Sequence, residues 1–439
     1  MSGSNTDEGL KRVVGISGLS LSIVNFTIGA GIFVLPAIVS INMGAFGILA
    51  YVFCGILMAC VMLCYAEIGS RVTSSGGTYA YVEAAFGSFA GYIINWLYFF
   101  AYSILGSAAL MNIVADSLAV LFPIFSNFVA RATLFFLLIG FMMLMNVRGA
   151  KQGIGFVKFI TIIKLLPLFA IIIFGLSYVK SNNFQWQHLP ALKTFGDTTL
   201  ILFFAFIGFD GALGVSGEIK NPKRTVPYSI LIGGLLVLTM YILLQTVVQG
   251  ALGTQIAGVK DAPLAAVAEK IIGPVGVTIL LISAAISCFG NVSADILATP
   301  RSLFAGANDG LFPKVLGKVH PKFATPFIAV IVYGTLIFIF SISGGFKQLA
   351  ILSSASVLII YLAVILSTIK LRREKQKVSE KTFRVPGGLM IPLIGVAAII
   401  WLLSSLSKIE ILAAAIFIFI VIVLYFVTKG FKKRKIIPV

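Results

Sequence analysis

The 439-residue sequence is poor in charged residues. Asp, Glu, Lys and Arg together make up 11% of it, against about 25% in an ordinary soluble domain. Hydrophobic residues make up 59%, and the mean hydropathy is +1.06. A soluble protein of this length needs a polar surface that this composition cannot supply. The composition therefore excludes a soluble enzyme, a disordered scaffold and a secreted disulfide module, and it predicts a polytopic membrane protein.

Cysteine and histidine are also scarce. The two histidines, His188 and His320, lie in loops far apart in the sequence, and no CxxC or Cys/His ligand spacing occurs. We therefore expect no disulfide, no metal site and no cofactor. No nucleophile–base pair or phosphate loop is present, so we expect no enzymatic activity. The four cysteines all fall in apolar blocks: Cys54, Cys60, Cys64 and Cys288.

Apolar blocks of membrane-spanning size recur twelve times. About 20 residues of helix cross the hydrocarbon core, and helices satisfy their own backbone hydrogen bonds in lipid. The predicted fold class is all-α, with a single transmembrane domain over residues 1–439. The predicted spans are 13–39, 45–67, 88–115, 132–147, 156–179, 198–217, 226–252, 275–299, 325–343, 347–369, 386–407 and 409–428.

The basic residues predict the orientation of these spans. There are 33 Lys and Arg against 15 Asp and Glu, and most of the basic residues fall in loops on the side that carries both termini. Basic loops stay in the cytoplasm, so both termini are predicted to be cytoplasmic in a cell membrane, plasma or inner. The tail Lys429 to Lys435 suits anionic lipids. No basic groove interleaved with aromatic residues occurs, so nucleic acid is not an expected partner.

Two spans carry glycine clusters that favour a broken helix. Glycine within a helix costs about 1 kcal/mol relative to alanine. Two interrupted segments in corresponding halves of a chain are typical of an inverted-repeat transporter with a binding site near the bilayer midplane. Close packing of helices is the alternative explanation. The clusters are Gly29-Ala30-Gly31 in the first span and Gly208, Gly211, Gly214 and Gly217 in the sixth.

Charged and polar residues inside spans are candidates for function, because a charge at the centre of a membrane helix costs at least about 2.5–3.5 kcal/mol. Lys164 lies deep in span five. It is either a cation beside the substrate cavity or a lysine that is paired with a carboxylate and has no functional role. Asp210 in span six either carries a proton or braces unwound backbone. In span eight a polar stripe at four-residue spacing faces either a cavity or another helix. Its members are Ser283, Ser287, Asn291 and Asp295.

Several motifs resemble those of amino acid permeases of the amino acid–polyamine–organocation superfamily. They cover spans one to eight in order, whereas the last four spans match only in layout. The motifs are Gly29-Ala30-Gly31-Ile32-Phe33-Val34-Leu35-Pro36, Ser75-Gly76-Gly77-Thr78-Tyr79-Ala80-Tyr81, Ala205-Phe206-Ile207-Gly208-Phe209-Asp210, Glu218-Ile219-Lys220-Asn221-Pro222 and Asp309-Gly310-Leu311-Phe312-Pro313.

The resemblance implies a five-plus-five inverted repeat with helices one and six broken. The repeats would cover about 13–179 and 198–370, followed by accessory helices at about 386–428. Backbone amides at Gly29, Ala30 and Gly31 would hold the substrate carboxylate, which suits a helix N-terminus. Carbonyls at Thr27, Phe204, Ala205 and Ile207 would hold its ammonium, with Phe204 as a lid. Tyr98, Tyr102, Asn291 and Asp295 would form the side-chain pocket.

The resemblance also implies that Lys164 occupies the place of a sodium ion, bridging carbonyls near Gly29 and the Ser287 hydroxyl. Sodium coupling is then not expected, and proton coupling through Lys164 or Asp210, or exchange, stays open.

The expected function is secondary transport of L-amino acids by alternating access, with spans one, two, six and seven rocking against the rest. Neutral substrates are favoured if Asp295 points toward Arg301, and cationic ones if it reaches the pocket. The alternatives are an exchanger of cationic amino acids or polyamines and a nutrient sensor on a transporter fold.

Overall fold

The computed structural model describes the chain from residue 15 to residue 434 with short gaps. Among the residues outside it are three predicted members of the glycine clusters, Ala30, Gly214 and Gly217. The side chains of the basic tail from 429 to 435 also lie outside the described part. The described residues are 15–29, 31–72, 78–148, 151–184, 189–213, 219–259, 262–308, 312–323, 325–373 and 383–434.

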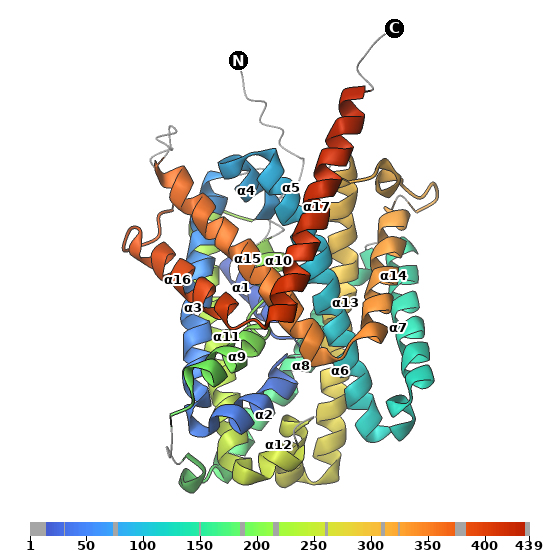
Figure 1. Ribbon diagram of the computed structural model, residues 1–439. Coiled ribbons are helices and arrows are strands. Elements are labelled where there is room, and N and C mark those ends of the chain that lie inside the picture. Colours follow the sequence, from blue (N-terminus) through green and yellow to red (C-terminus); the bar gives the residue numbers. More distant parts are fainter. Residues whose placement is uncertain are drawn as a thin grey trace.

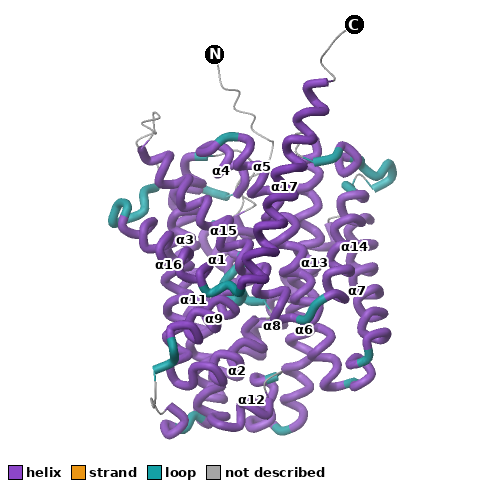
Figure 2. The backbone as a smooth tube through the Cα atoms, in the orientation of Figure 1, coloured by secondary structure: helices purple, strands orange, loops and turns teal. Residues whose placement is uncertain are grey.

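The described chain consists of helices joined by short loops and contains no strand (Figure 2). Each of the twelve predicted spans coincides with one to three consecutive helical segments, which confirms the all-α, polytopic class. In the first half these are α1 (Ile16–Thr27), α2 (Gly31–Met43), α3 (Gly47–Arg71), α4 (Thr78–Phe86), α5 (Ser88–Trp96), η2 (Leu97–Ile104), α6 (Leu105–Leu121), α7 (Phe128–Arg148) and α8 (Lys151–Gly175).

The second half of the described chain is also helical. Its helices are α9 (Leu192–Phe203), α10 (Phe209–Leu213), α11 (Pro222–Leu252), α12 (Pro263–Ile272), α13 (Pro274–Asn308), α14 (Phe327–Ser343), α15 (Phe346–Arg373), α16 (Met390–Ser404) and α17 (Lys408–Arg434). Short 3-10 turns join several of them, at Gly44–Phe46, Pro123–Ser126, Leu176–Tyr178, Ser181–Phe184, Gly253–Val259 and Lys314–Gly317.

Seven segments of the described chain are long and apolar enough to cross a membrane, and four shorter apolar helices accompany them. Burial separates central from peripheral helices. In α15, 67% of the apolar membrane-spanning segment of 18 residues is buried by other helices, whereas in α17 only 6% of that segment is buried. The exposed side chains of α17 include Ile409, Phe419 and Phe426. Apolar side chains exposed in this way suit lipid, so α15 is a core helix and α17 a peripheral one (Figure 1).

Two helices are interrupted inside the bundle, as the glycine clusters predicted. The first break lies between the end of α1 at Thr27 and the start of α2 at Gly31. The second break covers residues 204–208, between α9 and α10, and it begins before the glycines. Only Gly208 of that cluster lies in the break, with φ of +110°. This conformation favours glycine because it has no Cβ.

The two breaks lie against one another. A Cβ on Gly208 would lie 2.6 Å from the carbonyl oxygen of Phe26, and one on Gly31 would lie 3.0 Å from Ala205. The Tyr241 hydroxyl of α11 donates to the carbonyl oxygens of Thr27 and Ala205, at 3.1 and 2.7 Å. The unwound segments of two distant helices are therefore held together by close backbone approach and one shared hydrogen-bond donor.

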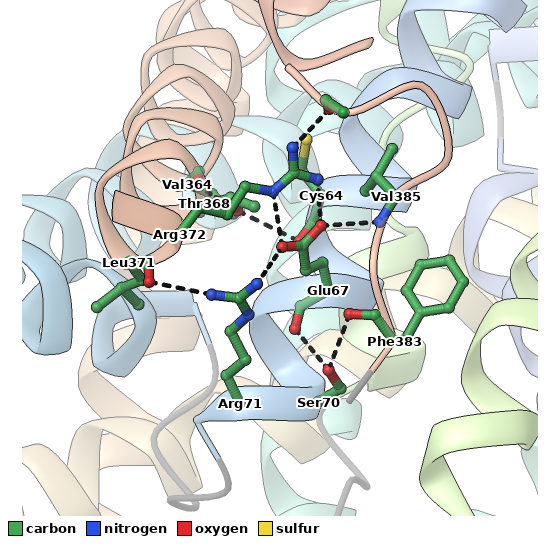
Figure 3. A network of polar contacts seen from close by, with 11 residues as sticks. Cys64, Glu67, Ser70, Arg71, Val364, Thr368, Leu371, Arg372, Phe383 and Val385 are labelled. Carbon is green, nitrogen blue, oxygen red and sulfur yellow. Dashed lines mark hydrogen bonds and ion pairs between the residues drawn. The ribbon is translucent and has the colours of Figure 1, made fainter. Parts of the chain in front are cut away.

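The breaks lie between the two ends of the bundle. Figure 1 shows α4 and the C-terminal end of α17 at one end, and α12 at the other. The first of these ends is the predicted cytoplasmic side. A buried ion-pair network lies near it (Figure 3), where Glu67 of α3 accepts hydrogen bonds from Arg71, from Arg372 of α15 and from the backbone N–H of Val385.

Candidate functional site

A cavity of about 370 Å³ lies beside the two breaks. It extends from them along α13 to α4, toward the predicted cytoplasmic end. Eleven of the fourteen predicted site residues line it, so the structure brings together residues from four separate spans. They are Thr27, Gly29, Gly31, Phe204, Ala205, Ile207, Tyr98, Tyr102, Asn291, Asp295 and Asp210. Of the other three, Lys164 and Ser287 are buried behind the wall, and Ala30 lies outside the described residues.

The first break presents the start of α2 to the cavity. Gly31 begins this thirteen-residue helix, and the first amides of a helix have no partner within it, so they attract an anion. Thr27, the last residue of α1, is 3% exposed, and its hydroxyl has no hydrogen-bond partner in the described chain. The first break therefore offers a site for a carboxylate beside an unused hydroxyl.

The second break contributes backbone and two side chains. Phe204 lines the cavity and packs edge-on against Phe346, with ring centroids 5.6 Å apart. Asp210 follows the break in the first turn of α10, and one of its carboxylate oxygens accepts from the Tyr361 hydroxyl at 2.9 Å. Its other oxygen is buried and has no partner among the described residues. Asp210 therefore braces α10 against α15 and retains one unused acceptor.

Lys164 approaches the first break from behind the cavity wall. Its side chain is fully buried, and the ammonium donates to the carbonyl oxygens of Asn25 at 2.6 Å and Ile28 at 2.8 Å. A third contact, at 3.2 Å, goes to the side-chain oxygen of Asn291. The ammonium thus neutralises the C-terminal end of α1, where carbonyl dipoles favour a cation.

The expected contact between Lys164 and Ser287 is wrong. The Ser287 hydroxyl is buried and hydrogen-bonds to no described residue, and Asn291, one helical turn further along α13, takes its place. The polar stripe on α13 is also divided. Asn291 and Asp295 line the cavity, whereas the Ser283 hydroxyl donates to the Ile279 carbonyl of its own helix at 2.7 Å. A four-residue spacing drifts around a helix, because four residues exceed one turn of 3.6.

Span three reaches the cavity through a π-helical segment, η2, which the sequence did not predict. It carries Tyr98, Tyr102 and Ser103, all of which line the cavity. The two tyrosine rings pack edge-on at 5.2 Å. Wide turns of this kind are rare and often occur at functional sites. Here three side chains of one helix with this wider turn face the cavity.

Asp295 is surrounded by hydroxyl groups. Ser107 and Tyr333 donate to its Oδ2 at 2.7 and 2.8 Å, and Thr299 donates to its Oδ1 at 3.0 Å. The Ser103 oxygen lies 2.9 Å from the same Oδ2 and 2.6 Å from the Tyr333 oxygen. Asp295 forms no ion pair in the described chain, although Arg301 lines the same cavity. We call these four hydroxyl residues the hydroxyl cage.

Neither the hydroxyl cage nor the cavity-lining position of Arg301 was predicted from the sequence. A signal for two cage members was present, because Ser103 and Ser107 are four residues apart in an apolar span. The same spacing identified the stripe on α13. Tyr333 lies alone in its apolar helix, and nothing in its local sequence distinguishes it from a core tyrosine.

Two further polar side chains at the α4 end complete the cavity. Asn95 has a buried side-chain nitrogen without a partner in the described chain. Burial raises the pKa of Tyr81 to about 12, so this tyrosine stays neutral at physiological pH. No group of three His, Cys, Asp or Glu side chains that could hold a metal occurs within the described residues.

A helical membrane body with two interrupted helices around a polar cavity is typical of secondary transporters. A family model described as amino acid permease matches residues 14–437. The chain therefore belongs to the amino acid permease family, and it is a multi-pass membrane transporter and not an enzyme.

Similar proteins include several bacterial and mammalian transporters. The chain is 28% identical over 436 residues to the serine/threonine exchanger SteT of Bacillus subtilis, covering 98% of this chain and 99% of SteT. It is 26% identical over 441 residues to the branched-chain amino acid permease BcaP of the same organism, covering 96% and 93%. It is also 30% identical over 349 residues to the large neutral amino acids transporter small subunit 2 of Mus musculus, covering 73% and 63%.

Proposed function

We propose that this permease is a sodium-independent secondary transporter that moves neutral L-amino acids by alternating access, with both termini in the cytoplasm. The observation that carries the proposal is the meeting of two helix breaks at one cavity, with a buried lysine ammonium on the carbonyls beside the first break. The five-plus-five repeat implied by the sequence suits this arrangement, with one break in each half.

The backbone at the breaks suits the two charged ends of an amino acid. The substrate carboxylate binds the amide end of α2 at Gly31. Its ammonium binds carbonyl oxygens of the second break, such as those of Ala205 and Ile207, because a carbonyl oxygen can accept a second hydrogen bond. The unpaired hydroxyl of Thr27 and carboxylate oxygen of Asp210 remain available to the same ligand. A buried polar group left unpaired costs about 1–3 kcal/mol, so a polar ligand is favoured here.

Lys164 supports the independence from sodium. Its three contacts lie beside the first break and place its ammonium group there. A second cation at the same carbonyls would meet this charge at close range in a low-dielectric surrounding. The lysine therefore takes the place that a coupling ion would need.

The preference for neutral substrates rests on the relatives and on the cage. The three relatives carry in their names serine and threonine, branched-chain amino acids and large neutral amino acids. The Asp295 carboxyl is occupied by hydroxyl groups. A cationic amino acid is the second candidate, because Asp295 nevertheless lines the cavity.

Uptake into proteoliposomes with a panel of labelled amino acids tests the proposal. Serine, threonine, leucine, lysine and arginine are each offered with and without a sodium gradient. We expect saturable uptake of the neutral members, unchanged by sodium. Uptake that requires sodium would contradict the role of Lys164, and binding without movement of any amino acid would favour a nutrient sensor.

A further inference from the structure

A second cavity, of about 190 Å³, lies between α3 and α11. Among the described residues that line it, only Thr27 carries a polar side chain, and most of the others are leucine, isoleucine, valine or methionine. Small residues at Gly55, Ala59 and Gly234 leave this space open. The two helices are already in contact beside it, because a Cβ on Gly55 would lie 2.7 Å from the Leu238 side chain. Closer packing of the helices therefore cannot fill the cavity.

The cavity lies near the middle of the bilayer. Its lining on α3 is centred on Ala59, which is the middle residue of that helix. The helix has 25 residues, so about twelve of them lie on either side of Ala59 and extend about 18 Å along the axis. This length exceeds half of the roughly 30 Å hydrocarbon core. At this depth the helices are surrounded by the acyl chains of lipids, and not by headgroups or water.

The cavity opens toward these acyl chains. Leu231 and Leu235, one helical turn apart on α11, line the cavity and are 56% and 67% exposed. Ala59 of α3 is also exposed. The inner lining is buried, because Met62 and Phe206 are each only 2% exposed. A ligand from the surrounding lipid would pass the two leucines and reach these buried side chains.

The lining suits a hydrocarbon chain. A water molecule in a cavity needs two to four polar partners, and the Thr27 hydroxyl is the one polar side-chain group of the described lining. An empty apolar cavity deprives its lining of dispersion contacts. Met58 and Met62 form part of this lining, and methionine adapts its shape to an irregular apolar ligand. The acyl chains outside the opening have the matching chemistry.

The inner end of this cavity is formed by the two breaks. Thr27, the last residue of α1, lines both this cavity and the substrate cavity. Phe206 belongs to the second break and packs edge-on against Tyr241, with ring centroids 5.1 Å apart. The Tyr241 hydroxyl is the donor shared by carbonyl oxygens of both breaks. A ligand in the second cavity therefore packs against the same backbone that lines the substrate cavity.

We propose that the second cavity binds an acyl chain of a membrane lipid, and that the bound chain stabilises the two breaks in the arrangement that forms the substrate cavity. The chain enters beside Leu231 and Leu235 and packs against Met62 and Phe206. A ligand that binds one conformation favours that conformation, so the acyl chain and the amino acid strengthen each other's binding. The stabilising effect rests on the proposed transport function, whereas the binding site itself does not.

Photolabelling tests the binding site without any transport. The full-length protein is reconstituted in vesicles that contain a phosphatidylcholine with a diazirine near the end of one acyl chain, irradiated, and digested for mass spectrometry. Surrounding lipid labels exposed residues on every helix, so the informative residues are buried ones. We expect label on Met58, Met62 and Phe206, which the acyl chain reaches only from inside the cavity.

Two leucine variants provide the matched comparison. Gly234→Leu fills the cavity from α11, where a Cβ meets only the Met62 sulfur, at an ordinary contact distance of 3.4 Å. The label on the three buried residues should be lost in this variant. Gly140→Leu places the same side chain on α7, where a Cβ meets nothing within 4 Å, and should keep the label. Ala59→Leu fills the cavity from α3 and replaces Gly234→Leu if that variant does not fold.

Substrate binding in nanodiscs tests the stabilising effect. The neutral amino acid that the panel identifies is bound in dioleoyl lipid and in diphytanoyl lipid, whose methyl branches widen the acyl chain. In the wild-type protein and in Gly140→Leu, we expect the apparent Kd to rise in diphytanoyl lipid by about fivefold, the low end of the usual coupling between two sites. In Gly234→Leu the Kd should be the same in both lipids, because the leucine side chain occupies the cavity.

Several outcomes would overturn the proposal. Label confined to exposed residues of the wild-type protein would refute the site, as would label on Met62 and Phe206 that persists in both filled variants. Label from a free diazirine fatty acid, but not from the phospholipid, would refute the assignment to a membrane lipid. An equal Kd in both lipids would refute the stabilising effect and leave the labelled site standing. Label without binding of any amino acid would refute the proposed function, and the stabilising effect with it, but not the lipid site.

Discussion

Replacing Glu67 by glutamine should strongly destabilise the protein, because Glu67 is the only acidic member of the buried network in Figure 3. The glutamate is fully buried, and the side chains of Arg71 and Arg372 are only 10% and 14% exposed. Arg71 donates to it at 2.6 Å, and Arg372 donates through two nitrogens. A glutamine has no charge and only one acceptor oxygen for these donors.

The expected loss can be worked out in two ways. Removal of one partner from a buried ion pair costs about 3–5 kcal/mol, because the remaining charge stays buried without compensation. Counting bonds gives a similar value, since about two charged hydrogen bonds are lost at roughly 1.5–3 kcal/mol each. We therefore expect the free energy of unfolding to fall by about 3–5 kcal/mol, which is about two to four orders of magnitude in the folding equilibrium.

Unfolding in mixed micelles, titrated with a denaturing detergent, measures this free energy. Asp197→Asn is the control, because it removes the same charge from an exposed pair with Lys193, whose side chains are 44% and 81% exposed. Such a pair contributes less than about 1 kcal/mol. The double variant Glu67→Gln/Arg372→Gln should recover part of the loss. If Glu67→Gln unfolds at the same detergent fraction as Asp197→Asn, the network does not stabilise the fold as argued.

Three further changes test the region of the breaks. Lys164→Ala should abolish or uncouple transport in a protein that still elutes as a folded monodisperse species, and normal uptake with unchanged pH dependence would exclude its ion-like role. Gly208→Ala should destabilise the protein by about 1–3 kcal/mol in the same detergent titration, whereas Gly345→Ala, which meets nothing within 4 Å, should not. Tyr241→Phe removes one hydrogen-bond donor from both breaks and should raise the KM of uptake about twofold to tenfold for every substrate. An unchanged KM would show that the shared bond does not hold the binding geometry.

The local sequence was sufficient to predict the long apolar helices, the two breaks and the buried position of Lys164, but not the short helices α4 and α12. Each of the predicted features leaves a signal within one span, such as a run of apolar residues, a cluster of glycines or a charge among isoleucines. Asp295 was found in the same way. The identity of its partners was not, because Tyr333 is 38 residues away and Ser103 is 192 residues away in the sequence. Only the packing of three helices brings them together.

The Glu67 network and the π-helical segment illustrate two other limits. In the sequence Glu67 ends a span and resembles a residue of the membrane surface, since Arg372 lies 305 residues later. Its burial depends on how α15 packs against α3. The wide turns of η2 have no residue signature comparable to proline or glycine, although three residues of this segment, Tyr98, Tyr102 and Ser103, line the cavity.

Tyr241 explains why the two breaks should move together. Its hydroxyl has one hydrogen and serves two carbonyl oxygens, one at each break, so neither segment can be displaced without weakening a bond to α11. The close approach of Gly208 to Phe26 adds a steric connection between the same segments. The predicted rocking of spans one, two, six and seven needs such a connection. The Glu67 network then joins α3, a member of that moving group, to α15 outside it, so the ion pairs lie at the boundary across which the two groups would rotate.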